Sequence, residues 1–247
     1  MNLILGLLNL VIVVTYEIIS NYYLSIHLGI IMLRLKNVTL FMADGRTDKK
    51  SFESSLFAVR QCIDKVEFGE VIFQSAYDSD IKGVGYKKVK PMVIGEYSKL
   101  ISGNLTDHIN TQFVLVIQHD GFILNTANWN PDFLNYDYIG APWLLEATKR
   151  PECRVGNGGF SLRSKKLLNV CKKHYGGTWD NEDWQICLVN KPLFESHGIV
   201  FAPLDVATWF SIESHIPEFD HDIKKRFGFH GPRQYEAVNA AYGFDLK

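Results

Sequence analysis

The segment Gln118-His119-Asp120-Gly121 carries side chains that could bind a cation, and it ends the most strand-like run of the chain, Thr111 to Gln118. Aspartate and histidine both ligate divalent cations, and a strand end holds them more rigidly than a loop does. The alternative is a turn in which Asp120 bonds its own backbone beside Gly121. A lone His-Asp pair is a weak indication of a metal site, so other ligands must join it.

The stretch from Asn128 to Trp143 concentrates aromatic, Asn and Asp side chains. Aromatic faces beside amide and carboxylate groups suit a sugar ring, which needs an apolar platform with hydrogen-bond partners at its rim. The alternative is ordinary aromatic packing in the core, which is favoured for Phe133 and Tyr138. We expect Trp143 to contact a sugar acceptor.

Three glycines lie in the segment Val155 to Ser164, before a strand-like run that ends in a helix cap at Ser164. An Asn-Gly pair is also typical of a hairpin turn, which explains part of the pattern. The third glycine exceeds the need of a two-residue turn and indicates that backbone approaches a ligand closely. Asn157 would then offer its amide to that ligand.

Two further segments contain titratable side chains. Asp180 to Trp184 is acidic and precedes a predicted helix, where such residues often serve only as caps. The same setting keeps Asp183 ionised, which is the state that a general base needs. His230 is framed by glycines and aromatic residues near the C-terminus, and its alternative role is that of a hydrogen-bonded core histidine.

The elements that must position these residues alternate between strands and helices. Hydrophobic patterns predict strands over 38–42, 71–74 and 113–117, a helix over 48–66 with Phe52, Leu56, Val59 and Ile63 on one face, and weaker helical character over 94–109. This alternation predicts an α/β fold with a mostly parallel central sheet flanked by helices. Ligands of such sheets bind beyond the carboxyl ends of the strands, where Gln118 to Asp120 would lie. After Pro151 the pattern changes to that expected of a substrate-binding half.

Composition narrows the class of protein. The 247 residues carry a formal net charge of −1, which argues against a broad nucleic-acid-binding surface. The length favours one domain. The four cysteines show neither zinc-site spacing nor the density of a disulfide scaffold, so we expect reduced thiols and a cytoplasmic protein.

The first 33 residues are hydrophobic and contain neither Lys nor Arg. Glu17 interrupts the run, and a carboxylate at the centre of a membrane span costs about 2.5 to 3.5 kcal/mol on insertion scales. One interpretation is a poor signal anchor, with Arg34 and Lys36 on the cytoplasmic side and weak membrane association. The other is that translation starts at Met32. We therefore divide the chain into a segment 1–33, an anchor or a non-native extension, and a domain 34–247.

Taken together, these motifs resemble a bacterial and viral family of glycosyltransferase-like proteins with a GT-A fold. The resemblance runs in order from about Val38 to Gly231. The matching segments are Gln118 to Phe122, Phe133 to Trp143, Gly156 to Ser164, Glu182 with Asp183, Phe201 to Pro203, and Phe227 to Gly231. It implies that residues 34–247 form a single GT-A-like domain.

The resemblance also implies roles for individual residues. Asp120 matches the last carboxylate of a metal-binding Asp-x-Asp motif, and His230 matches a late histidine ligand of Mn²⁺ or Mg²⁺. Gln118 stands at the first carboxylate position, which lowers the expected cation affinity. The nucleotide-binding residues would be Asp44, Gln118, His119 and Asp120, the acceptor-binding residues Trp143, Asn157, Gly158, Gly159 and Phe160, and the catalytic residues Asp183 and Glu182.

The resulting hypothesis is a metal-assisted, inverting glycosyltransferase of polysaccharide or glycoconjugate biosynthesis. It would move a sugar from a nucleotide diphosphate donor to a carbohydrate hydroxyl that Asp183 deprotonates, without a nucleic-acid partner. The first alternative is a catalytically silent carbohydrate- or nucleotide-sugar-binding protein, which the neutral Gln118 favours. The second is a metal phosphohydrolase, which would release phosphate without an acceptor.

Overall fold

The computed structural model describes residues 32–77, 84–177, 179 and 181–247. The chain divides into two units, Met1–Leu33 and Arg34–Lys247, and the fold described here is that of the second. The expectations of an anchor or an extension before Met32 fall on residues outside the described part. Among the described residues, no helix has the length and apolarity that crossing a bilayer requires.

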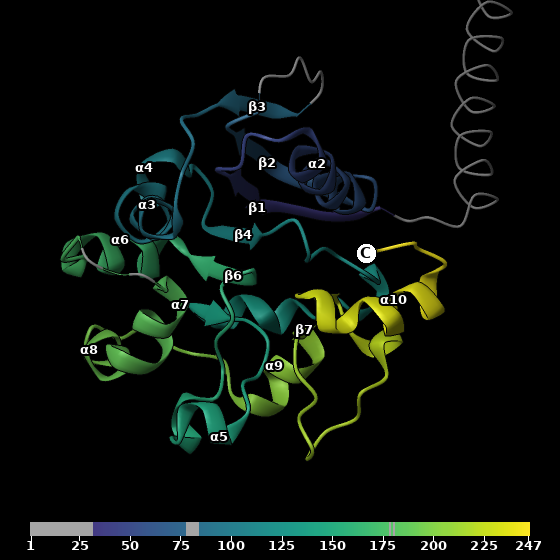
Figure 1. Cartoon of the computed structure of the whole chain (residues 1–247). Helices are drawn as coiled ribbons and strands as arrows, with labels where there is room; N and C mark the ends of the chain where they lie inside the picture. Colours follow the sequence, from purple (N-terminus) through teal and green to yellow (C-terminus); the bar gives the residue numbers. More distant parts are fainter. Residues whose placement is uncertain (1–31, 78–83, 178, 180) are drawn as a thin grey trace, which may run out of the picture. The chain divides into compact units, whose positions relative to one another are not determined.

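The central sheet has six strands in the spatial order β3-β2-β1-β4-β6-β5 (Figure 1). Their bounds are β1 (Leu33–Asp44), β2 (Val66–Ser75), β3 (Gly85–Lys88), β4 (Phe113–Ile117), β5 (Tyr138–Ile139) and β6 (Phe160–Ser164). β1 pairs with β4 and β2 with β3 in parallel, whereas β6 is antiparallel to both of its neighbours. The predicted α/β class with a mostly parallel sheet is confirmed.

The helices are α2 (Lys49–Ile63), α3 (Ile94–Lys99), α4 (Leu105–His108), α5 (Leu145–Thr148), α6 (Lys165–His174), α7 (Glu182–Trp184), α8 (Lys191–Ser196), α9 (Leu204–Phe210) and α10 (Tyr235–Tyr242). A π-helical turn, Leu100–Asn104, joins α3 to α4, so the helical character expected over 94–109 is confirmed. A second π-helical turn, Gln185–Val189, follows α7.

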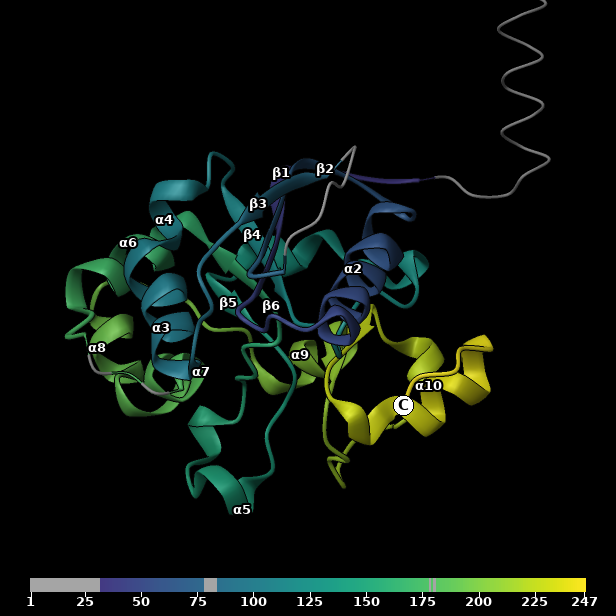
Figure 2. The same ribbon diagram turned by 45° about the horizontal axis from the view of Figure 1, so that its top comes forward.

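The helices cover both faces of the sheet. Figure 2 shows α2 on one side and α3, α4 and α6 on the other. Side chains alternate along β4, so that Val114 and Val116 pack in one core cluster with Leu105 and Leu168. The buried face of α2 includes Phe52 and Val59 as predicted, but Ser55 and Cys62 complete it, and the predicted Leu56 and Ile63 are only half-buried.

A separate two-stranded sheet carries the C-terminal part of the site. β7 (Ser211–Ile212) and β8 (Gly228–Phe229) pair in parallel, with Ile212 opposite Phe229. Their carboxyl ends therefore point the same way, and the next residue of each strand, Glu213 or His230, emerges at one end of this small sheet.

Candidate active site

The sheet register brings the predicted motifs to one edge. Because Met42 of β1 pairs with Ile117 of β4, Asp44 and Gln118 leave their strands at the same end. β6 runs antiparallel to β4 and starts opposite Ile117, so the glycine-rich segment that precedes β6 reaches this end too. The Gln118 N–H donates to the Gly159 carbonyl over 2.9 Å.

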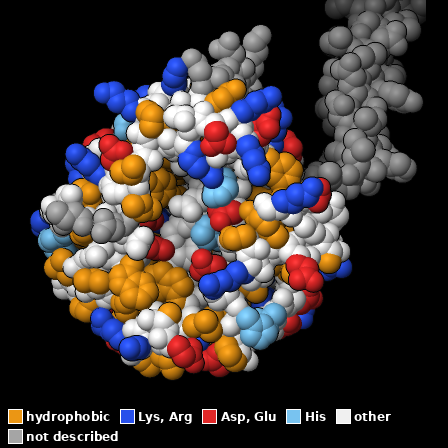
Figure 3. All heavy atoms as spheres, viewed as in Figure 1, with side chains coloured by type: hydrophobic (Ala, Val, Ile, Leu, Met, Phe, Trp, Pro, Cys, Tyr) orange, Lys and Arg blue, Asp and Glu red, His pale blue; other side chains and the backbone are white. Residues whose placement is uncertain are grey.

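The small sheet joins this edge from the C-terminal side. The Gly231 N–H donates to the Asp120 carbonyl over 2.9 Å, and the His230 N–H donates to the Ile212 carbonyl over 3.0 Å. These backbone bonds hold the His230 imidazole against Gln118 and Asp120, although more than a hundred residues separate them in sequence. Figure 3 shows a hollow on this face, with histidine and acidic side chains on its wall.

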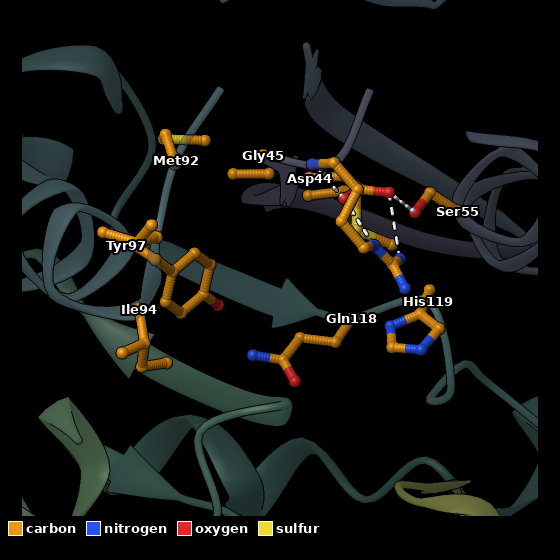
Figure 4. Close-up of a pocket in the computed structure, with 12 residues that line it drawn as sticks. Asp44, Gly45, Ser55, Met92, Ile94, Tyr97, Gln118 and His119 are labelled. Carbon is orange, nitrogen blue, oxygen red and sulfur yellow. Dashed lines mark hydrogen bonds and ion pairs between the residues drawn. The ribbon is translucent and has the colours of Figure 1, made fainter. Parts of the chain in front are cut away.

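A cavity of about 250 Å³ lies beside β1 and β4, with Asp44, Tyr97, Gln118 and His119 among its lining residues (Figure 4). Met42, Met92 and Ile94 add apolar surface to the wall. An apolar wall with a few polar groups is typical of a small-molecule site.

The carboxylate of Asp44 already accepts hydrogen bonds from neighbouring side chains of this protein. Arg46 donates to it through Nε (2.8 Å) and a terminal nitrogen (3.0 Å), and Ser55 Oγ donates over 2.7 Å. Burial alone would raise the pKa of Asp44, but these hydrogen bonds hold it below its ordinary value. Asp44 therefore lines the cavity with its carboxylate already bonded, while Arg46 presents the guanidinium that a ligand would meet.

His119 stands on the wall of this cavity and also lines a neighbouring one of about 560 Å³ between α2 and the C-terminal residues. Burial, opposed by the nearby charge of Asp120, lowers the pKa of His119 below its ordinary value. A neutral imidazole at this position can both donate and accept hydrogen bonds.

Gln118, Asp120 and His230 form the centre of the site. His230 Nε2 lies 3.2 Å from Gln118 Oε1 and 3.2 Å from Asp120 Oδ1, and His230 Nδ1 lies 3.4 Å from Glu213 Oε1. Burial alone would lower the pKa of His230, but the carboxylates of Asp120 and Glu213 raise it to about 9. In this arrangement His230 is an imidazolium between two acids.

The spacing of the ligand atoms in this cluster fits a divalent cation, which would have to displace the proton from His230 Nε2, because an imidazolium has no lone pair for a metal. Ligands about 2.1 Å from an octahedral Mg²⁺ lie about 3 Å apart when they are adjacent, close to the spacing around His230 Nε2. Asp120 Oδ1 is buried without a well-aligned hydrogen-bond partner among the described residues. The described part of the chain holds no group of three or more His, Cys, Asp or Glu placed to bind a metal. A cation here would thus need ligands from a substrate, as Mg²⁺ commonly does.

The glycine-rich segment is packed tightly by this protein's own side chains. A Cβ on Gly159 would lie 2.0 Å from His230 Nε2, and a Cβ on Gly158 would lie 2.2 Å from Glu182 Oε1. Asn157, directly before them, adopts φ +64°, and its Oδ1 accepts from the Gly159 N–H over 3.0 Å. The glycines therefore admit His230 and Glu182, a reason for their presence that does not require a ligand.

Glu182 and Asp183 are adjacent but have different surroundings. Glu182 is buried and pairs with the fully buried guanidinium of Arg163 over 2.9 Å. Asp183 accepts from the Gly158 N–H (2.9 Å) and from the Trp184 N–H (2.7 Å). Burial, together with the nearby charge of Glu182, raises the pKa of Asp183 to about 6.

Asp183 opens into a third cavity, of about 340 Å³, which Glu213, Arg233 and two tryptophans also line. The rings of Trp143 and Trp184 lie 5.5 Å apart at 44°. Since Glu213 also contacts His230, this cavity adjoins the candidate cation site.

Two predicted acceptor-binding side chains point elsewhere. The Phe160 ring is fully buried among Phe210 and Phe227, with centroids 5.3 and 6.0 Å away. The Asn157 side chain is 2% exposed and its oxygen bonds the loop backbone. Both residues are buried as a whole, so neither offers a surface to an acceptor, whereas Trp143 lines the cavity of Asp183.

Sequence reasoning missed Arg46, Arg163, Glu213 and Arg233. Arg46 was detectable, because it follows Asp44 by two residues at the end of a strand. Glu213 and Arg233 belong to no predicted motif, and only the pairing of β7 with β8 brings Glu213 beside His230.

A comparison with known protein families identifies the family of this chain. Residues 93–230 match the family described as protein of unknown function DUF5672. The chain belongs to this family. The match spans both the candidate cation site and the acidic pair, so Gln118, Asp120, Asp183 and His230 all lie within it. No curated protein matches the sequence significantly.

Two solved structures are similar to this DUF5672 protein. A glycosyltransferase involved in the glycosylation of the major capsid of PBCV-1 is 14% identical, with a TM-score of 0.45 over 84% of this chain and 99% of that chain. The mannosyltransferase PcManGT from Pyrobaculum calidifontis, in complex with GDP-Man and Mn²⁺, is 11% identical, with a TM-score of 0.41 over 68% of this chain and 54% of that chain. Both scores are below 0.5, so neither similarity carries an argument about activity.

Proposed function

We propose that this protein is a GT-A-like glycosyltransferase that moves a sugar from a nucleotide diphosphate donor to an acceptor hydroxyl. One observation carries the proposal: the Gln118–Asp120–His230 cluster adjoins both the cavity of Asp44 and Arg46 and the cavity of Asp183. A transferase needs these three sites side by side in space: a nucleotide pocket, then a diphosphate site, then a base for the acceptor.

The donor would occupy the cavity beside β1 and β4. Its apolar wall suits a nucleobase, and the Arg46 guanidinium, fixed by Asp44, suits a phosphate or ribose oxygen. Asp120 and His230 would hold a Mn²⁺ or Mg²⁺ ion, and Gln118 would add an amide oxygen. Such a cation, when bound, neutralises charge that develops on a departing diphosphate.

The acceptor would lie in the cavity of Trp143 and Trp184. Their indole rings offer an apolar platform next to Asp183, so a sugar stacked there can direct a hydroxyl to the carboxylate. A pKa of about 6 leaves Asp183 mostly ionised at neutral pH and more basic than an ordinary aspartate. Direct displacement by the deprotonated hydroxyl inverts the anomeric carbon. Glu182 would position this base, because its charge is already paired with Arg163.

A glycosyl-transfer assay tests the proposal. The purified protein is incubated with single nucleotide sugars, Mn²⁺ and a panel of oligosaccharide acceptors, and products are detected by mass spectrometry. We expect a glycoside product that requires both donor and acceptor. Nucleotide-sugar hydrolysis without an acceptor requirement, or no turnover with any donor, would contradict the transferase.

The alternative of a nucleotide-sugar-binding protein without turnover is favoured by one observation. Asp120 and Glu213 already have a positive partner in His230, which offsets part of their negative charge without a cation. A binding protein predicts thermal stabilisation by a nucleotide sugar that is independent of Mn²⁺, with no product formed.

A further inference from the structure

A cavity of about 400 Å³ lies between helix α9 and the segment 127–133. It shares no lining residue with the three cavities near the candidate active site. Its lining includes two tryptophans, Trp129 and Trp209, and the polar residues Asn130, Asp205 and Lys225. Nothing in the proposed transfer reaction uses these side chains.

Trp209 provides a large exposed aromatic surface in this cavity. Its side chain remains 47% exposed, which is unusual for so large an apolar group. The Arg226 guanidinium carbon lies 5.1 Å from the indole centroid, and Arg226 itself is buried. The next residue, Phe210, is fully buried and packs at a tilt against Phe227 in the aromatic core. The indole is therefore held in place from behind while a large part of it stays in solvent.

Polar side chains line the same cavity as this indole. Asp205 precedes Trp209 by four residues on α9, so both side chains lie on one helix face, and both line the cavity. Within the described chain, the Asp205 carboxylate has no ion pair or hydrogen bond from another side chain. Asn130 lines the same cavity, and its Oδ1 accepts from the Asp132 N–H over 2.9 Å, a bond that does not use the amide NH₂.

We propose that this cavity binds a pyranose ring of a carbohydrate chain, separately from catalysis. The ring packs its apolar face on Trp209, because a fixed exposed indole offers a flat apolar surface. Two neighbouring hydroxyls donate to the Asp205 carboxylate, which accepts through both oxygens, and the Asn130 amide donates to a third oxygen.

A proline-rich peptide is the competing occupant, because such peptides also dock on aromatic side chains. They need a groove of successive aromatic pockets and make no use of an unpaired carboxylate. The carboxylate and amide that line this cavity favour the sugar. The proposal does not depend on the transferase activity, since the two sites share no residue.

Affinity electrophoresis in native gels tests the site. Soluble dextran, α-mannan, β-galactan and β-glucan are cast in the gels at increasing concentrations, and dissociation constants follow from the retardation of the protein. We expect one or more of these polysaccharides to retard the wild type. Trp209→Ala should weaken that binding at least tenfold and Asp205→Asn several-fold, while melting temperatures stay close to wild type because both side chains are exposed.

Two matched variants interpret the result. Leu193→Ala removes another exposed apolar side chain, 38% exposed on α8, and should leave retardation unchanged. Trp184→Ala removes the exposed tryptophan of the proposed acceptor cavity and so measures how much of the retardation comes from that cavity; the retardation that remains should still be lost on Trp209→Ala. The proposal is overturned if no polysaccharide retards the wild type, or if Trp184→Ala abolishes retardation that Trp209→Ala leaves intact. Binding of a proline-rich peptide through Trp209, without polysaccharide binding, would also overturn it.

Discussion

Arg163 and Glu182 form an ion pair that is buried beneath the glycine-rich segment, with 2.9 Å between a guanidinium nitrogen and Glu182 Oε1. The same guanidinium nitrogen lies 3.3 Å from the Gly158 carbonyl, and Arg163 also lies over the Tyr138 ring. The Gly158 N–H in turn donates to Asp183. The buried pair thus fixes the backbone that orients the proposed base.

Replacing Glu182 with Gln should destabilise the fold. Removing one partner of a buried ion pair leaves an uncompensated charge, here on Arg163, and typically costs about 3 to 5 kcal/mol. Urea unfolding monitored by tryptophan fluorescence measures the loss. Glu67→Gln is the matched control, because Glu67 pairs with Arg34 and Lys36 at the surface and should change stability little. Equal effects of the two substitutions would contradict a structural role for Glu182.

Asp183→Asn should abolish transfer and leave donor binding intact. The substitution keeps the size of the side chain but removes the proton acceptor, and general-base catalysis typically contributes 10²- to 10⁴-fold in rate. We expect kcat to fall at least a hundredfold, with an unchanged thermal shift by the nucleotide sugar. Asp107→Asn, at a surface pair with Lys172, is the control and should retain full activity. Transfer within a few-fold of wild type would exclude Asp183 as the base.

The raised pKa of Asp183 predicts a pH dependence of both rate and stability. Transfer should decline as the pH falls below about 6, because protonated Asp183 cannot accept the hydroxyl proton. The folded protein holds this proton more tightly than the unfolded chain does, so Asp183 lowers the free energy of unfolding as pH rises from about 4 to 6. Asp183→Asn should therefore gain stability relative to wild type between pH 4.5 and pH 7. Parallel stability profiles for the two proteins would show that the pKa is not raised.

The sequence predicts the elements of this fold better than the contacts of its side chains. Hydrophobic spacing depends only on neighbours along the chain, so the strand ending before Gln118 and the helix after Asp48 could be located. Their motifs meet at one edge because parallel strands share their carboxyl ends. The bond between Asp44 and Arg46 depends instead on the side-chain conformation of Arg46. The position of Glu213 beside His230 depends on the pairing of two strands that are only two residues long. The role of the glycine-rich segment was equally hidden from the sequence, because its glycines make room for His230 and Glu182, which lie far from them along the chain.

Removal of divalent cations should weaken donor binding. Gln118 Oε1 and Asp120 Oδ1 each lie 3.2 Å from His230 Nε2, so the three atoms could serve as ligands of one cation, and the diphosphate would complete the coordination. We expect EDTA to abolish stabilisation by the nucleotide sugar in differential scanning fluorimetry and added Mn²⁺ to restore it. Asp120→Asn and His230→Ala should each remove the Mn²⁺ effect. Asp132→Asn is the control because Asp132 lies in an exposed turn. Stabilisation that EDTA leaves unchanged would argue against the cation.

Arg46→Ala should separate the role of Arg46 from that of Asp44. The guanidinium bonds Asp44 through Nε and one terminal nitrogen, so its second terminal nitrogen keeps donors for a phosphate or ribose oxygen. Its loss also leaves the Asp44 carboxylate uncompensated beside an anionic donor. Both effects weaken donor binding, and we expect the dissociation constant of the nucleotide sugar, measured by isothermal titration calorimetry, to rise at least tenfold.

Arg46→Lys should recover part of the affinity, since an ammonium keeps the charge without the paired geometry. Arg60→Ala removes an exposed guanidinium from α2 and should leave binding at the wild-type level. If Asp44→Asn weakened binding while Arg46→Ala did not, the carboxylate would be the contact, as the family resemblance implies.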